Sequence, residues 1–219
     1  MKIPYERQHY KTGNRMCGAA VIFMVLKSFR ENCSQEKIWN EIKVSDGKGE
    51  YYAEVNKVCQ FFLDRNFNSL HLSAKDPIEL LKFCQKHSVP VILGHRLNID
   101  SKIGHFTVFI KIVGNSVSVN DPDKDSKPGK GRKIKFSELL ELMDGKGEVA
   151  RNSCTIVTKK PLNIGHCGVC DSEIPLFKVC RHCNSDLSLE PSLFIGCLDF
   201  NCSQALVNVI FCPHCNSPI

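Results

Sequence analysis

Hydrophobic positions in the first part of the chain repeat at helical spacing. Residues 18–30 are apolar on nearly every side, which is typical of a buried helix. Residues 34–42 are amphipathic, and Ser34 is a favourable N-terminal cap for them. Residues 51–64 space their apolar side chains three and four positions apart, and Asp76-Pro77-Ile78-Glu79 favours a helix start. The pattern predicts a mainly helical N-terminal part.

From residue 89 onward the hydrophobic pattern becomes that of β-strands. Residues 106–113 and 116–121 alternate and flank Gly114-Asn115, a dipeptide favoured in tight hairpin turns. The other predicted elements are a buried strand at 89–93, a basic loop at 123–135, a short helix at 137–143 and a closing strand at 154–158. Helices followed by an antiparallel sheet predict the α+β class.

Cysteine and charge divide the chain near Lys160-Pro161. Of the 13 cysteines, eight lie after residue 160. The net charge is +6, but only two basic residues against five acidic ones follow Pro161, so the positive charge belongs to the first part. We therefore predict two domains, residues 1–160 and residues 161–219.

The sequence also carries a prediction of location. Its longest apolar run, Ala19 to Leu26, is far shorter than the roughly 20 residues that span a bilayer. The first residues lack the apolar core of a secretory signal. We expect a cytoplasmic protein without a membrane partner.

Three residues of the first part suit cysteine-nucleophile chemistry. Cys17 lies between a polar segment and the first helix, where the helix dipole favours a thiolate. Gly18 beside it leaves room for a substrate backbone. His105 begins one hairpin strand and Asp121 ends the other, an order that allows a Cys–His–Asp triad. Gln8 is a candidate donor to an oxyanion.

These residues stand in motifs that resemble a known family. The motifs are Gln8…Cys17-Gly18-Ala19-Ala20, Gly104-His105-Phe106-Thr107-Val108 and Val117-Ser118-Val119-Asn120-Asp121-Pro122. Over roughly residues 1–158 the chain resembles the C39 and C39-like peptidases of the papain-like superfamily. The resemblance implies a papain-like fold with Cys17 as nucleophile, His105 as base, Asp121 as orienting group and Gln8 as oxyanion donor.

The best-known members of that family cut leader peptides after a Gly-Gly pair and are fused to membrane transporters. This chain differs from them in having no transporter helices and a longer gap between Gln8 and Cys17. Its cysteine-rich C-terminal part has no counterpart in the family. The main prediction is a cysteine peptidase acting on a peptide or protein.

Two other functions remain open at this stage. A papain-like site can transfer its acyl group to an amine or deamidate a glutamine, and a domain without active chemistry can serve as a zinc-dependent adaptor. The remaining single thiols and histidines are expected to be structural: Cys33, Cys59, Cys84, Cys154, His9, His71, His87 and His95. The lysines and arginines of residues 123–135 are expected to be solvated, with an acidic partner near the cleft as the alternative.

The strongest motif is the set of cysteine pairs in the C-terminal part. Cysteine pairs with two to four residues between them provide the soft, tetrahedral ligands that Zn²⁺ prefers. Equal spacing predicts two structural zinc ions bound in sequence order, one by Cys167, Cys170, Cys180 and Cys183, the other by Cys197, Cys202, Cys212 and Cys215. This arrangement resembles a tandem zinc ribbon.

The zinc-binding part is predicted to recruit a substrate or protein partner. Its shortage of basic residues argues against nucleic acid. The candidate contact residues are Phe194, Ile195, Leu198 and Phe200. As a separate domain it should be removable, so a chain ending near Lys160 is expected to keep a reactive Cys17.

The hairpin limits where its side chains can point. A regular two-residue turn at Gly114-Asn115 sends His105 and Asp121 to opposite faces, and puts Phe106 and Val108 on the face of Val117 and Val119. The triad needs imidazole and carboxylate within about 3 Å. We therefore predict a three-residue turn, or a bulge just before Asp121. Without either, Asn120 would be the next candidate for the orienting role.

Overall fold

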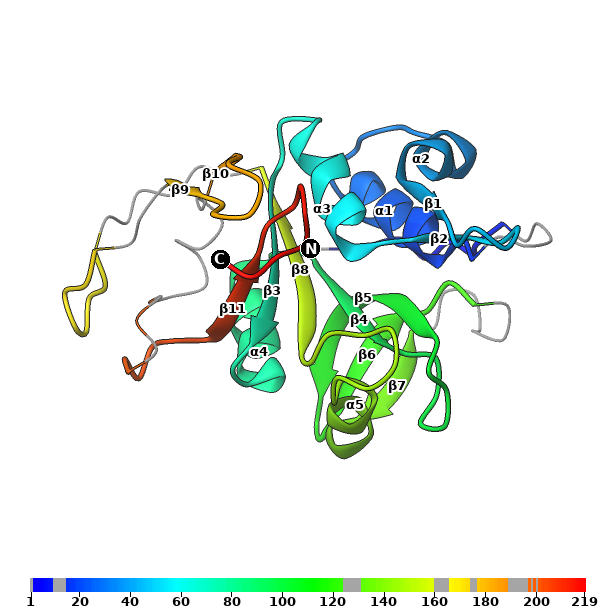
Figure 1. Ribbon diagram of the computed structural model, residues 1–219. Coiled ribbons are helices and arrows are strands. Elements are labelled where there is room, and N and C mark those ends of the chain that lie inside the picture. Colours follow the sequence, from blue (N-terminus) through cyan, green and yellow to red (C-terminus); the bar gives the residue numbers. More distant parts are fainter. Residues whose placement is uncertain are drawn as a thin grey trace.

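Seven antiparallel strands form the main sheet, in the order β11-β3-β8-β4-β5-β6-β7 (Figure 1). The computed structural model describes residues 2–9, 15–123, 131–159, 166–173, 177–188, 197, 199 and 201–219. The strands are β3 (Asn68–Ala74), β4 (Val91–Arg96), β5 (Gly104–Val113), β6 (Ser116–Asn120), β7 (Arg132–Lys135), β8 (Ser153–Thr158) and β11 (Val207–Phe211).

Five helices cover the two faces of this sheet. They are α1 (Cys17–Ser28), α2 (Gln35–Ile42), α3 (Val55–Leu63), α4 (Pro77–His87) and α5 (Phe136–Leu142). Figure 1 shows α1, α2 and α3 on one side of the sheet and α4 and α5 on the other. The first group packs on Ile92, Phe106 and Val108, whereas the second packs on a separate core that includes Leu93 and Phe109. The α+β prediction is confirmed.

Local sequence explains where several helices begin. The hydroxyl of Ser34 accepts a hydrogen bond from the backbone N–H of Lys37 and caps α2, as predicted. The Asp76 carboxylate caps α4 in the same way. Helix α1 differs, because its cap residue Met16 makes no side-chain hydrogen bond to the first turn. The N-terminus of α1 therefore keeps backbone N–H groups without a side-chain acceptor.

Gly18 makes a close contact inside the protein. A Cβ at this position would lie 2.6 Å from the Cβ of Ala53, so only glycine lets α1 pack this closely on the strand β2 (Tyr51–Ala53). The predicted room for a substrate backbone stays a prediction. Strand β2 pairs with β1 (Lys43–Ser45) in a small separate hairpin.

Several segments differ from the predicted elements. Residues 51–53 are a strand, and the helix predicted over 51–64 starts at Val55. Strand β3 was missed, although its alternation of apolar Leu70, Leu72 and Ala74 with polar residues is that of a strand. Residues 132–135, predicted as loop, pair with β6 as strand β7, and residues 124–130 of that loop lie outside the described residues.

The C-terminal part contributes a strand to the main sheet. Strand β11 pairs with β3, and its Val207 and Ile210 are buried in the same core as Leu72 and Ile78. A second hairpin, of β9 (Phe177–Val179) and β10 (Asp186–Ser188), stands apart from this sheet. The predicted boundary at Lys160-Pro161 lies outside the described residues. A division there would separate β11 from the strand that it pairs with.

The β5–β6 hairpin contains the predicted irregularity at another position. Its turn is regular, since Val113 pairs with Ser116 on either side of Gly114-Asn115. The register then shifts between Phe109 and Lys111, which leaves Ile110 as an extra residue in β5. The prediction of a bulge is confirmed, but its location just before Asp121 is wrong.

This bulge redirects the side chains of β5. The pairing register differs by one residue on the two sides of the bulge. Before the bulge, the odd-numbered side chains of β5 therefore share a face with the odd-numbered side chains of β6. Phe106 and Val108 accordingly pack with the α1–α3 side, whereas Val117 and Val119 pack on the opposite side. The predicted common face for these four residues is therefore wrong.

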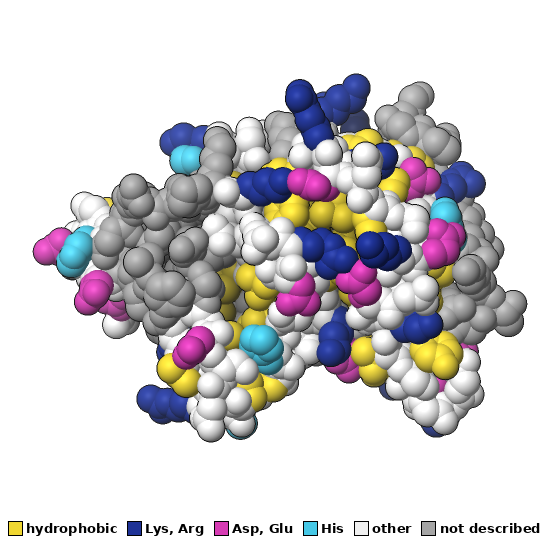
Figure 2. All heavy atoms as spheres, turned by 90° about the horizontal axis from the view of Figure 1, so that it is seen from above, with side chains coloured by type: hydrophobic (Ala, Val, Ile, Leu, Met, Phe, Trp, Pro, Cys, Tyr) yellow, Lys and Arg dark blue, Asp and Glu magenta, His cyan; other side chains and the backbone are white. Residues whose placement is uncertain are grey.

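The surface carries charges of both signs. Figure 2 shows basic and acidic side chains interspersed around a central group of hydrophobic side chains on one face of the molecule. Across the described parts of the chain, no helix has both the length and the apolar character that a bilayer crossing requires.

Candidate active site and metal-binding cysteines

Cys17 is the first residue of α1 and lines a cavity at one end of the sheet. It is 6% exposed, so its thiol is shielded but lies at the cavity wall. The first turn of α1 contains no acidic residue and has no side-chain cap. The positive end of the helix dipole therefore acts on Cys17 without a competing carboxylate, a position that suits a cysteine nucleophile.

His105 lies between Cys17 and Asp121. Its Nε2 is 2.7 Å from Oδ1 of Asp121, and both side chains are 4% exposed. Burial opposes the charged imidazolium, but hydrogen bonds with Asp121 and with Cys17, and their charges, outweigh it and raise the pKa of His105 to about 10. An imidazolium of this kind stabilises a thiolate and can give up its proton during a reaction.

The carboxylate of Asp121 is fixed by further donors. Its Oδ1 accepts a hydrogen bond from the backbone N–H of Asp123 at 3.0 Å, and its Oδ2 accepts one from Arg132 at 3.1 Å. Burial favours the neutral acid, but His105 and these donors together hold the pKa of Asp121 well below its usual range. Asp121 is therefore charged and oriented at neutral pH.

Sequence reasoning missed the part that Arg132 plays. It was grouped with the solvated lysines and arginines of a loop, yet its guanidinium bridges Asp121 and Glu138. The signal available in the sequence was the alternation Arg132-Lys133-Ile134-Lys135, in which the apolar Ile134 is fully buried. A strand beginning at Arg132 pairs with β6 and so comes back to Asp121 at the end of that strand.

His95 is a buried neighbour of the candidate base. It faces His105 across the β4–β5 pair, with ring centroids 5.5 Å apart. Burial, and then the positive charge of His105, lower the pKa of His95 to about 4. Its Nδ1 donates to the carbonyl of Arg96, and Nε2 accepts from the hydroxyl of Thr107. It is the satisfied structural histidine that the sequence predicted.

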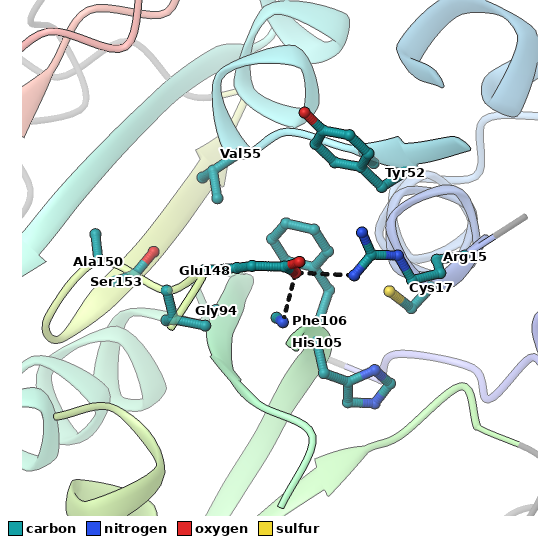
Figure 3. A pocket seen from close by; sticks show the side chains of 13 residues that line it. Arg15, Cys17, Tyr52, Val55, Gly94, His105, Phe106, Glu148, Ala150 and Ser153 are labelled. Carbon is teal, nitrogen blue, oxygen red and sulfur yellow. Dashed lines mark hydrogen bonds and ion pairs between the residues drawn. The ribbon is translucent and has the colours of Figure 1, made fainter. Parts of the chain in front are cut away.

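An ion pair crosses the cavity beside Cys17 (Figure 3). Arg15 donates to the Glu148 carboxylate at 2.8 Å, and the same carboxylate oxygen accepts from the backbone N–H of Gly104 at 2.9 Å. Arg15 precedes α1, and Gly104 begins the strand that carries His105. Glu148 therefore joins the two elements that supply the candidate nucleophile and base.

The cavity is small, at about 80 Å³. For comparison, a cavity of roughly 150 Å³ is needed to hold benzene. Its other lining residues are Tyr52, Ala53, Val55, Gly94, His105, Phe106, Val149, Ala150 and Ser153. This size suits a peptide backbone and small side chains.

Gln8 lies near the triad but outside the cavity lining. Its backbone N–H donates to the carbonyl of Pro122, the residue after Asp121, at 2.9 Å. Its side chain is half-buried and is not among those that line the cavity. Its role as an oxyanion donor stays a prediction.

The eight C-terminal cysteines form two groups, but not in the predicted order. One group is Cys167, Cys170, Cys197 and Cys202, and the other is Cys180, Cys183, Cys212 and Cys215; within each, all sulfur atoms lie within 4.8 Å of one another. Each group thus takes one pair from each half of the segment. The predicted grouping in sequence order is wrong.

Strand length explains this crossed arrangement. Strand β11 lies between Cys202 and Cys212, and five extended residues span roughly 17 Å. Two pairs at opposite ends of such a strand cannot bind the same ion. Strand β9 separates Cys170 from Cys180 in the same manner. Each pair therefore combines with the pair from the other half.

A short repeat surrounds three of the four pairs. Asp171, Asn184 and Asn216 follow their pairs, and all three have positive φ angles between 55° and 59°. In each repeat the N–H of the first cysteine donates to the carbonyl of the serine five residues later. Asp and Asn tolerate this left-handed conformation well. The motif Cys-x2-Cys-(Asp/Asn)-Ser is visible in the sequence and marks three similar turns.

The geometry of both groups fits Zn²⁺. Sulfur–sulfur distances within them are 3.7 and 3.4 Å in the first group and 3.6 and 3.7 Å in the second. Four sulfurs at about 2.3 Å from one tetrahedral ion lie about 3.8 Å apart. Backbone N–H groups of Asp199 and Gln204 point to sulfurs of the first group, as is common around bound metal. Both groups could therefore hold a metal ion.

Three other cysteines are core residues, as predicted. Burial raises the pKa of Cys59 to about 11 and that of Cys84 to about 12, and it raises the pKa of Cys154 further. These thiols are neutral and unreactive at ordinary pH. The predicted contact residues Phe194, Ile195, Leu198 and Phe200 lie outside the described residues.

Comparison with solved structures supports the fold. The chain is similar to a double glycine motif protease from an AMS/PCAT transporter, solved in complex with the leader peptide, with 22% identity and a TM-score of 0.51 over 73% of this chain and 93% of that one. It is also similar to the peptidase domain of Streptococcus ComA, a bifunctional ABC transporter, with 15% identity and a TM-score of 0.55 over 73% and 100% of the two chains.

A third similar structure is described as a C39-like peptidase from Bacillus anthracis, with 19% identity and a TM-score of 0.54 over 73% and 96% of the two chains. No curated protein sequence matches the chain. The sequence profile of the Peptidase C39 family matches residues 2–142, well over half of the chain. The protein is a cysteine peptidase that belongs to the Peptidase C39 family.

Proposed function

We propose that Cys17, His105 and Asp121 form the catalytic triad of this peptidase. The observation that carries the proposal is the position of His105, which hydrogen-bonds to Asp121 through Nε2 while it interacts with the Cys17 thiol. The three residues come from α1, β5 and the end of β6, and the bulge at Ile110 brings the last two to one face. A cysteine held in this way is a nucleophile with its proton donor already in place.

The proposed reaction is acyl transfer to water. The Cys17 thiolate attacks the carbonyl carbon of a peptide bond, and the imidazolium of His105 gives its proton to the leaving amine. This breaks the C–N bond and leaves a thioester on Cys17. Water then attacks the thioester while His105 takes its proton, and the acid product leaves as the thiolate returns. Asp121 keeps the imidazole oriented throughout.

Backbone donors at the start of α1 are suited to stabilise the oxyanion. The N–H of Cys17 is not used by a side-chain cap and points from the positive end of the helix. Gln8 is the proposed second donor, because its backbone hydrogen bond to Pro122 holds it beside the end of β6.

The proposed substrate is a peptide with small residues before the cleaved bond. The cavity is small, at about 80 Å³, which favours small side chains in it. A structurally similar protease is named for a double glycine motif and was solved with a leader peptide. A fluorogenic peptide with Gly-Gly before the scissile bond is therefore the first substrate to test.

The cysteine groups are proposed to bind two structural zinc ions. Four thiolates leave no position open for water or substrate, so these ions would stabilise the fold without taking part in the reaction. All thirteen cysteines are free, which suits the reducing cytoplasm. The exposed Val169 and Val179, 61% and 55% accessible, lie in this segment and are candidates for contact with a protein partner.

An electrophile and a peptide together test the triad. Iodoacetamide should label Cys17 selectively, and Cys17→Ala should lose the label, whereas Cys33→Ala, which removes a half-buried thiol elsewhere, should keep it. Cys17→Ala and His105→Ala should each lower hydrolysis by at least about 10³-fold. Full activity of Cys17→Ala would overturn the proposal.

Product mass separates the enzymatic alternatives. A cleaved peptide supports hydrolysis, a glutamine converted to glutamate indicates deamidation, and a joined product indicates transfer to an amine. Selective labelling of Cys17 without any of these products, over a range of peptides, would favour a binding module.

A further inference from the structure

A buried serine lies at the far end of the active-site cavity. Ser153 begins β8, is 1% exposed and lines the cavity together with Gly94 of β4. Figure 3 shows both residues across the cavity from Cys17. A Cβ on Gly94 would lie 2.8 Å from Oγ of Ser153, so a side chain at position 94 would press on this hydroxyl. The acyl-transfer steps do not use it.

His71 holds the Ser153 hydroxyl in place. Its Nε2 lies 3.1 Å from Oγ of Ser153, and both groups are buried. Ser73 pairs with Ser153 across β3 and β8, and His71, two residues away, points to the same face. A hydroxyl has one donor and two acceptor sites, so Ser153 keeps unused capacity for a group in the cavity.

The C-terminal strand in turn holds His71. Phe211 pairs with His71 across β11 and β3, and their rings stack with centroids 4.6 Å apart and planes 20° from parallel. The next residue, Cys212, belongs to the second cysteine group. A continuous set of contacts therefore leads from the cysteine segment through Phe211 and His71 to the cavity.

We propose that Ser153 is a substrate-binding residue whose hydroxyl hydrogen-bonds to a backbone peptide group of the substrate, and that His71 and Phe211 position it. The inference rests on the proposed peptidase function, because it assigns the cavity to the substrate. A peptide backbone brings N–H and C=O groups wherever it enters, and burying one of them without a partner is unfavourable. Ser153 is a cavity-lining hydroxyl that meets this need, and the C-terminal strand thereby completes the cavity.

Steady-state kinetics on the Gly-Gly peptide test the role of Ser153. Ser153→Ala should raise KM by about 3- to 10-fold and change kcat by less than about 2-fold, since one hydrogen bond to bound substrate is lost. Ser69→Ala is the matched control: Ser69 is on β3, is 2% exposed and donates to the carbonyl of Ile156, away from the cavity. Its KM should stay at the wild-type value.

A double-mutant cycle separates positioning from general destabilisation. Phe211→Leu should raise KM in the wild-type protein but not in Ser153→Ala, because the group that it positions is already missing. Phe83→Leu is the control: Phe83 also packs against a histidine ring, that of His87, with centroids 4.4 Å apart, and lies on α4. Equal effects of Phe211→Leu with and without Ser153 would overturn the positioning role.

Binding to the inactive protein keeps this inference distinct from the proposed function. The Gly-Gly peptide should bind Cys17→Ala, and adding Ser153→Ala should raise the Kd by the same 3- to 10-fold, about what loss of one hydrogen bond predicts. Absence of hydrolysis by the wild type would contradict the peptidase mechanism alone. Equal Kd values with and without the Ser153 hydroxyl, or no binding by either protein, would overturn the role of Ser153.

Discussion

The triad and the cysteine groups each unite residues from distant parts of the chain, yet different forces hold them. His105 and Asp121 are 4% exposed and fixed by strand pairing, and Cys17 is at the end of a helix whose apolar face is buried. The cysteine groups have little core of their own: among the residues that the structure describes, the clusters around these cysteines contain one other buried side chain, Leu187, with Ile219 packed against it. Cys170, Cys183 and Cys215 are exposed.

This difference has a physical consequence for folding. The triad can form before any ligand is present, because about 20 buried apolar side chains on each face of the sheet stabilise it. The cysteine segment is too small for such a core, so the ions that its thiolates could bind would provide the missing stability. Strand β11 belongs to both regions, since it is buried in the main sheet and lies between ligands of the two groups.

Removing β11, the strand shared by the triad region and the cysteine segment, should have the largest effect. A chain ending at residue 159 would uncover the edge of β3 and lose the buried Val207 and Ile210, at a cost of about 3–6 kcal/mol, a large share of typical domain stability. We expect aggregation and little labelling of Cys17, in contrast to the removable domain that the sequence predicted.

Two point variants sharpen this test. Ile210→Ala should destabilise the full chain by about 2–4 kcal/mol in a thermal or urea unfolding experiment. Val209→Ala, on the same strand but only half-buried, should cost less than about 1 kcal/mol. A soluble, well-folded chain ending at residue 159 with normal labelling would show that β11 is dispensable.

Zinc content tests the crossed groups directly. We expect about two zinc ions per chain, and Cys180→Ser should remove one of them. Adding Cys212→Ser should leave the remaining ion, because both cysteines belong to one group; adding Cys202→Ser should remove it. Elemental analysis of the purified proteins distinguishes these outcomes, and loss of both ions in Cys180→Ser/Cys212→Ser would restore the grouping in sequence order.

The pH dependence of activity tests how Asp121 supports His105. The raised pKa of His105, about 10 against 6.5, means that its charged form contributes stability that is fully present below pH 6.5 and is lost as the pH rises through about 10. Asp121→Asn removes a main cause of the shift. We expect kcat to fall about 10- to 100-fold and the alkaline loss of activity to move to lower pH.

Arg132→Gln is the milder companion of that variant. It removes one of the donors to Asp121 but leaves the hydrogen bond to His105. The alkaline loss of activity should again move to lower pH, but by a smaller amount than in Asp121→Asn. If the alkaline side of the profile of kcat against pH is the same in Asp121→Asn as in the wild type, the orienting role of Asp121 is contradicted.

The smallest effect is expected at the ion pair beside the cavity. Glu148→Gln removes the charge that Arg15 meets but keeps an acceptor for the N–H of Gly104. Because Glu148 is half-exposed, we expect only about a 2- to 5-fold change in KM. Glu79→Gln, which removes the exposed pair with Lys82, is the control and should change nothing. A 100-fold or larger change in KM would show that Glu148 contributes more to substrate binding than a half-exposed ion pair can.

The sequence predicted the fold class and the residues that meet at the triad because both depend on local signals. Cys17 begins an apolar helix, and His105 and Asp121 stand at neighbouring ends of two hairpin strands, where a bulge puts them on one face. The pairing of the cysteines could not be predicted from equal spacing. It depends on β11 being a strand of the main sheet, which is a long-range contact with β3.

Arg132 and Ser153 show the same limit for single residues. Arg132 looks like any solvated arginine until β7 is paired with β6, and Ser153 looks like any strand serine until β8 lies between β3 and β4. Their roles come from neighbours that are more than ten residues away in the chain. Only the register of the sheet identifies those neighbours.

The bulge at Ile110 also sets a rule for insertions and deletions in this hairpin. Deleting Ile110 would make the register regular and leave every other pair of the hairpin unchanged, so His105 and Asp121 would still share a face. Adding one residue elsewhere in β5 between His105 and the turn, without a second bulge, would turn His105 to the face opposite Asp121, whereas adding one on each strand would keep them together. Relatives with an intact triad should therefore either lack the bulge together with its extra residue or vary the length of this hairpin in matched pairs of residues.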